Sequence, residues 1–255
     1  MPLVSDQAIC IRHWDWSETS QTVSLFARDH GIIRGIAKGA RREHSTFSGG
    51  IELMTRGEVV VSLKPTDALS TLTAWDLQET FRASRATLAG FYGGMAILDI
   101  VQHSLQPGDP HPEFYDAAVS GLRALAVAGK EREAVLSVLW RALVETGHAP
   151  QLSIDIRSGE SLADVPVYGF WPGLGGFSVE TTPPSLMAEP NLQTVWKVRR
   201  ETLHFLRGET PIVDPEAATD TTRRAMQLLL AYFRWIFSDE MRALTQFVAL
   251  TSPTP

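Results

Sequence analysis

The sequence predicts an α+β protein of several domains, in which an N-terminal β-barrel of the OB type precedes an α-helical bundle. Five short strand-like runs separated by turns fall within the first 80 residues, a density that is typical of a small closed barrel. Beyond residue 81, apolar residues recur every three to four positions, as they do on one face of a helix. We therefore expect a barrel over residues 1–80 and a helical domain over residues 81–255.

Each predicted strand is a short apolar or alternating run that ends at turn residues. The turns include Asp29-His30-Gly31 and the pair Gly49-Gly50. A partial sandwich fits the same pattern, but five strands in so short a segment favour a closed barrel. The predicted strands comprise residues 8–12, 22–27, 32–37, 59–63 and 70–77.

The helical domain is interrupted by an irregular insert. Between about residues 150 and 190 the helical periodicity disappears and prolines and glycines accumulate, so we expect irregular chain or short strands there. Residues 106–110 and 129–130 read as loops between helices. The predicted helices comprise residues 88–98, 114–125, 135–143, 192–206 and 219–250.

Composition and cysteine content predict a cytoplasmic protein. Apolar residues make up 44% of the chain and charged residues 20%, which is the balance of an ordinary globular protein. No apolar run approaches the roughly 20 residues that a membrane-spanning helix needs, and the N-terminus does not read as a signal peptide. The single cysteine, Cys10, cannot form an internal disulfide, and its strand-like setting predicts a buried apolar role.

A local excess of positive charge between residues 28 and 42 is the most informative functional feature. The chain carries a formal net charge of −6, yet this segment has five Lys or Arg residues against one Asp. Such a cluster on an acidic protein indicates a surface that meets phosphates, although solvated surface charge is the alternative. The candidate DNA-binding residues are Arg28, Arg34, Lys38, Arg41 and Arg42.

Strand alternation and one glycine predict how these cations are arranged. Alternation along residues 32–38 places Arg34 and Lys38 on the outer face and small residues on the inner face. Gly39 then allows the backbone to turn, so that the two following arginines reach the same groove. OB barrels bind single strands through such cations and through aromatic rings that stack on bases. The aromatic residues nearest in sequence are Trp14, Trp16 and Phe47.

A second basic cluster is a weaker candidate. Its members are spaced three or four residues apart and would share one face of a helix, from which they could extend a nucleic-acid track or bind an acidic peptide tail. Two nearby glutamates favour the plainer interpretation of a charged surface helix. The cluster consists of Lys197, Arg200, His204 and Arg207.

The sequence does not favour an enzyme. It contains no phosphate-binding loop, dinucleotide-binding glycine motif, zinc-protease motif or nucleophile elbow. We see no pair of carboxylates spaced for general acid and base catalysis, and none clustered as a nuclease would require. The loop from His103 to Glu113 could nominally supply metal ligands, but its prolines and irregular spacing favour an ordinary interhelical loop.

Several of these segments together resemble a known family. The strongest is the string LFARDHGIIRGIAKGARR, which ends at Arg42 and follows Thr19 and Thr22. Supporting matches are Phe47, residues 49–52, the strand at 58–63, the GHAPQL turn at 147–152 and the helix at 229–244. On these residues the chain resembles the bacterial RecO family of recombination mediators over its whole length.

The resemblance implies a role in DNA repair, DNA damage and homologous recombination. Proteins of the RecO type bind single- and double-stranded DNA, anneal complementary strands and, with the partner RecR, help load the RecA recombinase onto strands coated by single-strand-binding protein. By the same resemblance, Arg34, Lys38, Arg41 and Arg42 are expected to contact DNA, with Arg28 in support. A cytoplasmic, nucleoid-associated location is implied as well.

The insert departs from the family pattern at a zinc site. Many similar proteins carry four cysteines there, whereas here Leu152 is followed by Asp155 and Ser158, and no cysteine follows Gly176. Thiolates or imidazoles are needed for a structural zinc, so we expect neither zinc nor any other cofactor in this degenerate zinc-finger-like insert. We expect packing of aromatic side chains to hold it instead, namely those of Tyr168, Phe170, Trp171 and Phe177.

A protein-interaction adaptor is the competing interpretation. In that case the basic face binds acidic peptide tails, such as those that end single-strand-binding proteins, and has no direct DNA role. A groove lined by all five cations favours nucleic acid, whereas a compact pocket with apolar walls favours a peptide end.

Overall fold

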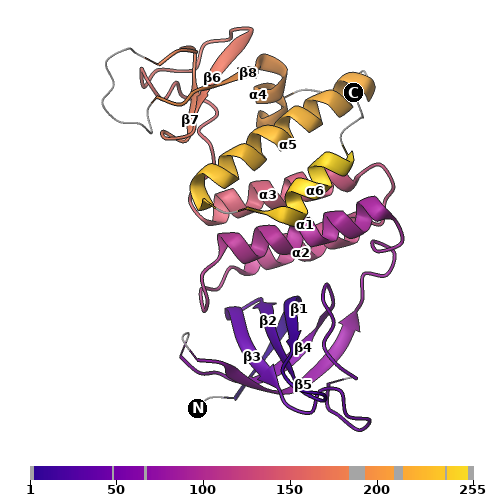
Figure 1. Ribbon diagram of the computed structural model, residues 1–255. Coiled ribbons are helices and arrows are strands. Elements are labelled where there is room, and N and C mark those ends of the chain that lie inside the picture. The colour runs from indigo at the N-terminus through magenta and orange to yellow at the C-terminus, as the bar shows by residue number, and fades with distance from the viewer. Residues whose placement is uncertain are drawn as a thin grey trace. The chain divides into compact units, whose positions relative to one another are not determined.

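The computed structural model of the chain describes residues 3–47, 49–65, 68–183, 193–209, 215–238 and 240–251. Strands come first, followed by helices and a second, small sheet (Figure 1). The elements in order are β1 (Leu3–Asp15), β2 (Gln21–Ala27), β3 (Gly31–Ala37), β4 (Arg56–Ser62), β5 (Ser70–Glu79), α1 (Leu88–Ser104), α2 (Pro112–Ala124), α3 (Glu131–Glu145), β6 (Val167–Trp171), β7 (Gly176–Ser178), β8 (Trp196–Arg199), α4 (Arg200–Arg207), α5 (Pro215–Phe237) and α6 (Arg242–Thr251).

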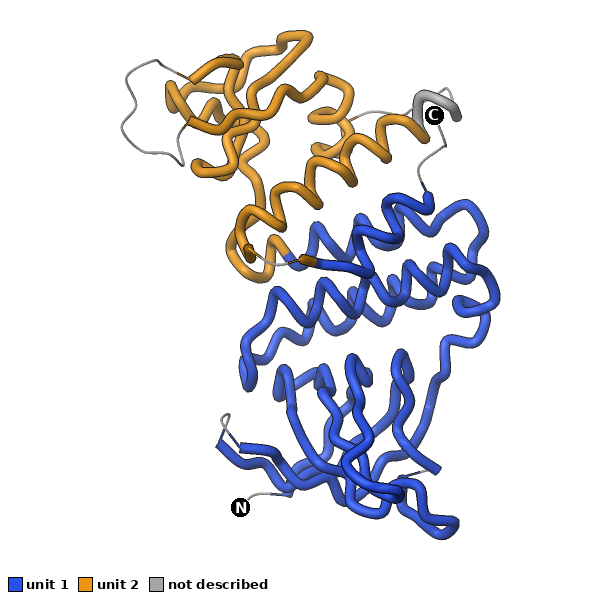
Figure 2. Tube along the Cα trace, in the orientation of Figure 1, with its two compact units in different colours: residues 1–142, 241–251 blue, residues 143–240, 252–255 orange. Residues whose placement is uncertain are grey.

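The chain divides into two compact units. The first comprises residues 1–142 and 241–251, and the second comprises residues 143–240 and 252–255 (Figure 2). The expected division near residue 80 separates strands from helices, whereas the compact units group the barrel with α1, α2, most of α3 and α6.

The five N-terminal strands close into a barrel in the order β1-β2-β3-β5-β4. The pair β3 and β5 is parallel and the other neighbouring pairs are antiparallel. This confirms the predicted OB-like architecture, and each predicted strand is present, with ends that differ from the prediction by one to a few residues. Small residues do face the interior: a Cβ added to Gly35 would lie 2.2 Å from the Leu72 side chain, so the parallel pairing requires glycine there.

The barrel interior contains two residues for which the sequence suggested a role, Cys10 and Phe47. Cys10 is fully buried, and burial raises the pKa of its thiol to about 12, so it packs as an apolar residue, as expected. Phe47 is only 4% exposed and belongs to the same core. It therefore offers no surface for a base to stack on, in contrast to its expected place among the stacking aromatics.

Helices α1, α2 and α6 complete the first unit. Thr87 caps α1 by accepting a hydrogen bond from the Gly90 amide. Helix α6 packs beside α1, although about 140 residues separate them in sequence (Figure 1). Asp99 on α1 accepts hydrogen bonds from the Ala243 and Leu244 amides at 2.9 and 3.4 Å, so a carboxylate of one helix caps the start of the other.

The second unit contains a three-stranded sheet in the order β7-β6-β8, together with α4 and α5. Here part of the predicted helix over residues 192–206 is wrong, because Trp196–Arg199 forms β8 and pairs with β6. The side chain of Val198 is buried while its neighbours Lys197 and Arg199 are exposed, which is the alternation of a strand. Helix α4 begins only at Arg200, and the Leu192 end of the prediction lies outside the described residues.

The predicted helix over residues 219–250 is divided in two. Helix α5 ends at Phe237 and α6 begins at Arg242. Ser238 follows α5 with a left-handed φ of 51°, a conformation that stops a right-handed helix.

Aromatic packing holds the insert, as expected. Tyr168, Phe170, Trp171 and Phe177 are each at most 1% exposed. The rings of Phe170 and Phe177 lie 5.0 Å apart, and Phe170 also meets Tyr232 of α5 at 4.9 Å. These edge-to-face contacts give the small sheet an apolar core of its own.

A buried carboxylate joins two loops of the insert. Asp155 accepts hydrogen bonds from the Arg157 and Ser158 amides on its own loop, at 2.9 and 3.3 Å. It also accepts from the Ser178 hydroxyl and the Val179 amide on the other loop, at 3.0 and 2.9 Å. Burial alone raises the pKa of Asp155, but these hydrogen bonds outweigh it and lower the pKa below the usual value.

We predict that Asp155→Asn loosens the insert, because an amide cannot accept all four hydrogen bonds. Loss of the buried carboxylate should reduce local stability by about 2 kcal/mol. The folded pKa is depressed, so the contribution is present above about pH 4 and is lost as the pH falls through the folded value. Amide hydrogen exchange over residues 155–180 should therefore be faster in the variant than in the native protein. Lowering the pH should speed this exchange less in the variant, because the variant has no carboxylate at this position to protonate.

Glu160→Gln is the matched control, since Glu160 is an exposed carboxylate of the same insert. Equal exchange in native protein and Asp155→Asn would show that Asp155 does not hold the loops together.

Candidate nucleic-acid interface

The outer face of the barrel brings cations and an aromatic ring into register across three strands. Strand β2 lies between β1 and β3, and directly opposed residues point to the same side of the sheet. One row, here called the arginine row, consists of Arg12, Ser24 and Arg34. The next row, here called the tryptophan row, consists of Trp14, Thr22 and Ile36.

Helix α2 covers the other part of this face. Phe26 pairs with Ile9 on one side and Ile32 on the other, and all three are buried. The Phe26 ring lies 5.6 Å from both Phe114 and Tyr115 of α2. The arginine and tryptophan rows follow along the same strands and include the exposed Arg12, Trp14 and Arg34. The accessible part of the outer face is therefore the part that carries positive charge.

The structure separates the five predicted cations into free and paired groups. Arg34, Lys38 and Arg42 are exposed and form no ion pair with any of the described residues. Arg34 and Lys38 lie on the outer side of β3 and beyond its end, as alternation predicts. Unpaired cations can neutralise phosphates without first losing an internal partner, so these three suit the predicted role best.

Arg28 and Arg41 already have carboxylate partners. Arg28 donates two hydrogen bonds to Asp116 of α2, at 2.9 and 3.1 Å, and one to Asp29 at 3.2 Å. Hydrogen bonding to Arg28 lowers the pKa of Asp116. Arg41 pairs with Asp15 at 2.6 Å. DNA contact by these two arginines stays a prediction, and it would require them to share or exchange their partners.

Gly39 has the expected left-handed conformation, with φ of 68°. The turn brings the Arg41 amide within 3.1 Å of the Thr19 carbonyl in the loop that joins β1 to β2. A Cβ added to Gly39 would lie 3.2 Å from the Arg42 side chain, so the arginine folds back over the turn. The glycine thus returns the basic segment toward the barrel.

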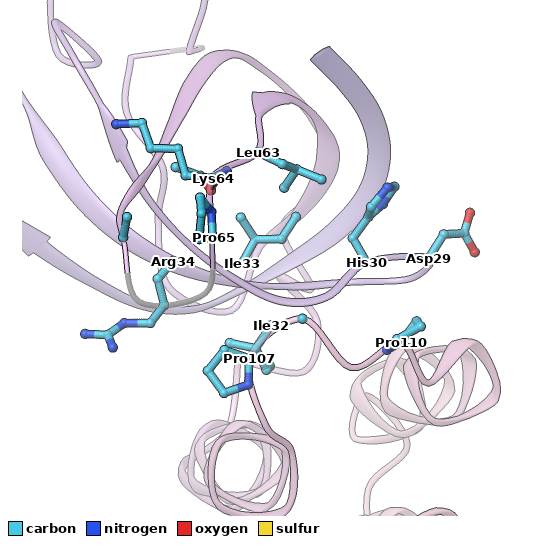
Figure 3. A pocket seen from close by; sticks show the side chains of 13 residues that line it. Asp29, His30, Ile32, Ile33, Arg34, Leu63, Lys64, Pro65, Pro107 and Pro110 are labelled. Atoms are coloured by element: carbon cyan, nitrogen blue, oxygen red, sulfur yellow. Dashed lines mark hydrogen bonds between the residues drawn. The ribbon is translucent and has the colours of Figure 1, made fainter. Parts of the chain in front are cut away.

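A pocket of about 200 Å³ opens beside the first half of β3. Arg34 and Lys64 lie at one end of it, and His30 and Asp29 at the other (Figure 3). Its walls are apolar and include Ile33. The ring of His30 is held 2.8 Å from the buried carboxylate of Asp6. This pocket holds one of the five predicted cations, Arg34, and adds Lys64.

The second basic cluster does not form the shared helix face that its spacing predicts. Lys197 lies on β8, and the other three residues lie on α4. Arg200 and His204 both face Asp164, at 3.1 and 3.6 Å. Arg207 donates to the Leu152 carbonyl through its Nε at 2.8 Å. The α4 residues thus have structural partners, and their nucleic-acid role stays a prediction.

The loop that nominally offered metal ligands contains internal hydrogen bonds. His103 bonds the Asp99 carbonyl at 2.7 Å, and His111 lies 3.2 Å from Asp109. Among the residues that the structure describes, no group of three His, Cys, Asp or Glu side chains is placed to hold a metal ion. Over the same residues, no helix is both long and apolar enough to cross a membrane.

Sequence reasoning missed Arg12 and Lys64. Simple alternation from Ala8 fails for β1, because the register shifts between Cys10 and Arg12. The bulge brings Arg12 into the arginine row, where no sequence pattern marks it. Lys64 follows β4 and approaches Arg34 only once the barrel has closed (Figure 3).

The fold and this face define a class of protein: an OB-like barrel with a cationic, tryptophan-bearing surface, joined to helices and a small sheet. The family model described as Recombination protein O N terminal matches residues 1–81, and the one described as Recombination protein O C terminal matches residues 85–239. The chain belongs to the RecO family.

Curated relatives share the name DNA repair protein RecO. The protein of Rhodopirellula baltica is 32% identical over 143 residues, which cover 56% of this chain and about half, 53%, of that protein. The protein of Nocardioides sp. is 29% identical over 237 residues, 91% of this chain and 94% of the relative. That of Thermobifida fusca is 27% identical over 247 residues, 96% and 98% of the two chains.

We predict that replacing both arginines of the arginine row by alanine weakens binding to a polyanion. The double variant Arg12→Ala, Arg34→Ala should elute from immobilised heparin at lower salt than the native protein, because two unpaired cations are lost.

The matched control is Arg123→Ala, Lys130→Ala, which changes the net charge equally but removes cations that are paired with Glu79 and Glu133. Equal elution of the two variants would mean that net charge, and not the outer face, determines the binding.

Proposed function

We propose that this chain acts in DNA repair and recombination by binding and annealing DNA on the outer face of its barrel. The observation that carries the proposal is the arginine row beside the tryptophan row. Unpaired cations on one row suit the phosphates of a strand, and the exposed ring of Trp14 on the next row suits stacking on a base. Trp16, which is 64% exposed, lies two residues further along the chain and extends the stacking surface.

Annealing by such a face needs no covalent step. Lysine and arginine neutralise phosphates and so lower the repulsion between two approaching strands. Stacking on a tryptophan is tolerant of sequence, so bases stay free to search for partners. We therefore propose a protein that is not an enzyme and requires no cofactor.

The proposed setting follows from the family. With RecR, the chain would act on single strands coated by single-strand-binding protein and help load the RecA recombinase, in the cytoplasm and at the nucleoid. The relatives named DNA repair protein RecO support this setting, and the free cations supply the chemistry for the DNA contact.

An adaptor that binds acidic peptide tails is the second candidate. The pocket beside β3 favours it, because apolar walls at Ile33 and Leu63 stand next to the cations Arg34 and Lys64. A peptide that ends in an apolar residue with acidic neighbours would suit that combination. DNA binding by the isolated chain separates the two candidates.

Changing Arg34, Lys38, Arg41 and Arg42 together to alanine should weaken binding to a labelled single strand. Each lost contact lowers the slope of log affinity against log salt by about 0.7, so we expect a fall of roughly 2 to 3, depending on whether Arg41 stays paired with Asp15. Fluorescence anisotropy across a salt series measures the slope.

Arg123→Ala is the control, because Arg123 is paired with Glu79 and is not among the five candidate cations, and it should leave the slope unchanged. If native protein and the fourfold variant bind alike, the barrel face is not the DNA site. If the native protein does not bind DNA, the adaptor candidate replaces the mediator.

Trp14→Ala should slow the annealing of two complementary strands. Loss of one stacking platform costs about 1–3 kcal/mol of strand binding, so the variant should need more protein to reach the native annealing rate. A fluorescence-quenching annealing assay measures that rate. Leu77→Ala, which removes an exposed apolar residue from β5, is the control and should anneal like the native protein. Native annealing by Trp14→Ala would remove the tryptophan row from the mechanism.

A further inference from the structure

A second pocket of the first unit lies between the bulged part of β1 and one face of α1. Its volume is about 310 Å³, at the lower end of the range for small-molecule pockets, roughly 300–1,000 Å³. Met95, Leu98, Asp99 and Gln102 follow one another at helical spacing and form the α1 side. The other side is formed by residues 11–14 and Leu53.

Two polar atoms on residues that line this pocket have no hydrogen-bond partner within the described part of the chain. The Nδ1 atom of His13 and the Oε1 atom of Gln102 are both buried, and neither has a hydrogen bond within the described part of the chain. Buried polar atoms in folded proteins are nearly always hydrogen-bonded, so these two orphans mark the side chains that would gain most from a polar ligand. The carboxylate of Asp99, in contrast, already has a partner, because it accepts a hydrogen bond from the Ala243 amide at the start of α6.

The pocket is continuous with the proposed DNA surface. Arg12 and Trp14 line it, and the same two residues belong to the arginine and tryptophan rows. A strand that lies on the outer face therefore passes the entrance of the pocket. Arg12 is exposed and can hold a phosphate at that entrance.

We propose that this pocket takes a single unpaired nucleobase from the bound strand, an inference that rests on the proposed DNA binding. A base has flat apolar faces, which match Met95 and Leu98, and a polar edge, which can satisfy both orphans. The Oε1 atom of Gln102 accepts a hydrogen bond from a ring or exocyclic N–H, and His13 supplies the second contact. An apolar side chain of a peptide would leave both atoms unsatisfied.

The pocket also gives the protein a reason to prefer unpaired DNA. A base within a duplex has its Watson–Crick edge occupied and cannot enter without being flipped out of the helix. A base held in the pocket keeps its strand single at one position while its neighbours stay exposed for pairing. A free nucleotide offers the same chemistry, so the test must separate it from a strand.

The test compares two labelled strands of equal length, one with normal bases and one in which the central positions are abasic. Their phosphates are the same, so the ratio of affinities isolates base recognition. The variant Gln102→Met keeps the side-chain length and removes the amide oxygen. One hydrogen bond to a neutral group changes binding by about fivefold, so the native ratio should fall by about that factor in the variant, with abasic binding unchanged.

The variant should melt at the same temperature as the native protein or above it, because it removes an orphan and breaks no contact. Gln78→Met, at an exposed site on β5, is the matched control and should keep the native ratio. An unchanged ratio in Gln102→Met would overturn the assignment of the pocket.

The remaining outcomes separate this inference from the proposed function. If the native protein binds both strands equally, the pocket is not a base site although DNA binding stands. If it binds neither, the proposed function itself fails. Deoxyadenosine monophosphate could instead bind the native protein as tightly as the strand does, and Gln102→Met could lose that binding. In that case the pocket binds a free nucleotide, and the proposal that it takes a base from a bound strand is overturned.

Discussion

The closure of the barrel through β1 is the constraint on which the rest of the first unit depends. The first half of this strand, Leu3–Ile9, pairs with β4, and the part from Ala8 to Asp15 pairs with β2, so its thirteen residues join two neighbours in succession. The register shift between Cys10 and Arg12 comes just after the strand changes from one neighbour to the other. Bulges bend a strand and redirect its side chains, and here the bulge brings Arg12 and Trp14 into line with Arg34 and Ile36 across β2. The proposed DNA-binding face is thus a consequence of how the barrel closes.

Ion pairing then determines which cations remain available. The barrel and α2 share a bidentate pair between Arg28 and Asp116, which contributes to the structure of the unit. Arg34, Lys38 and Arg42 have no such partner among the described residues. Paired and unpaired arginines look the same in sequence. A cluster of charged residues therefore indicates a candidate binding region, but it does not show which of its residues are free to bind. The distinction comes from side chains such as Asp116, which lies 88 residues away.

Local patterns of the sequence predicted most of the fold, and long-range contacts account for the failures. All five barrel strands, the first three helices and the glycine turn at Gly39 follow from alternation, periodicity and turn residues. Trp196–Arg199 was misassigned because three-residue charge spacing fits a helix, whereas pairing with β6 makes it a strand. Phe47 was misjudged because proximity to basic residues does not reveal burial. The orphans at His13 and Gln102 come from segments far apart and could not be predicted from either segment alone.

The balance of charge fits the proposed annealing of DNA, in which the protein must release the strand that it binds. With a net charge of −6, the chain as a whole repels DNA, and the unpaired cations on the outer face of the barrel oppose that repulsion locally. Few phosphate contacts give modest affinity and a shallow salt dependence, so a strand can leave once it has paired. A strongly basic protein would hold single strands and the annealed duplex alike. Discrimination then has to come from contacts that only an unpaired base can make, and stacking on Trp14 and entry into the pocket beside α1 are contacts of that kind.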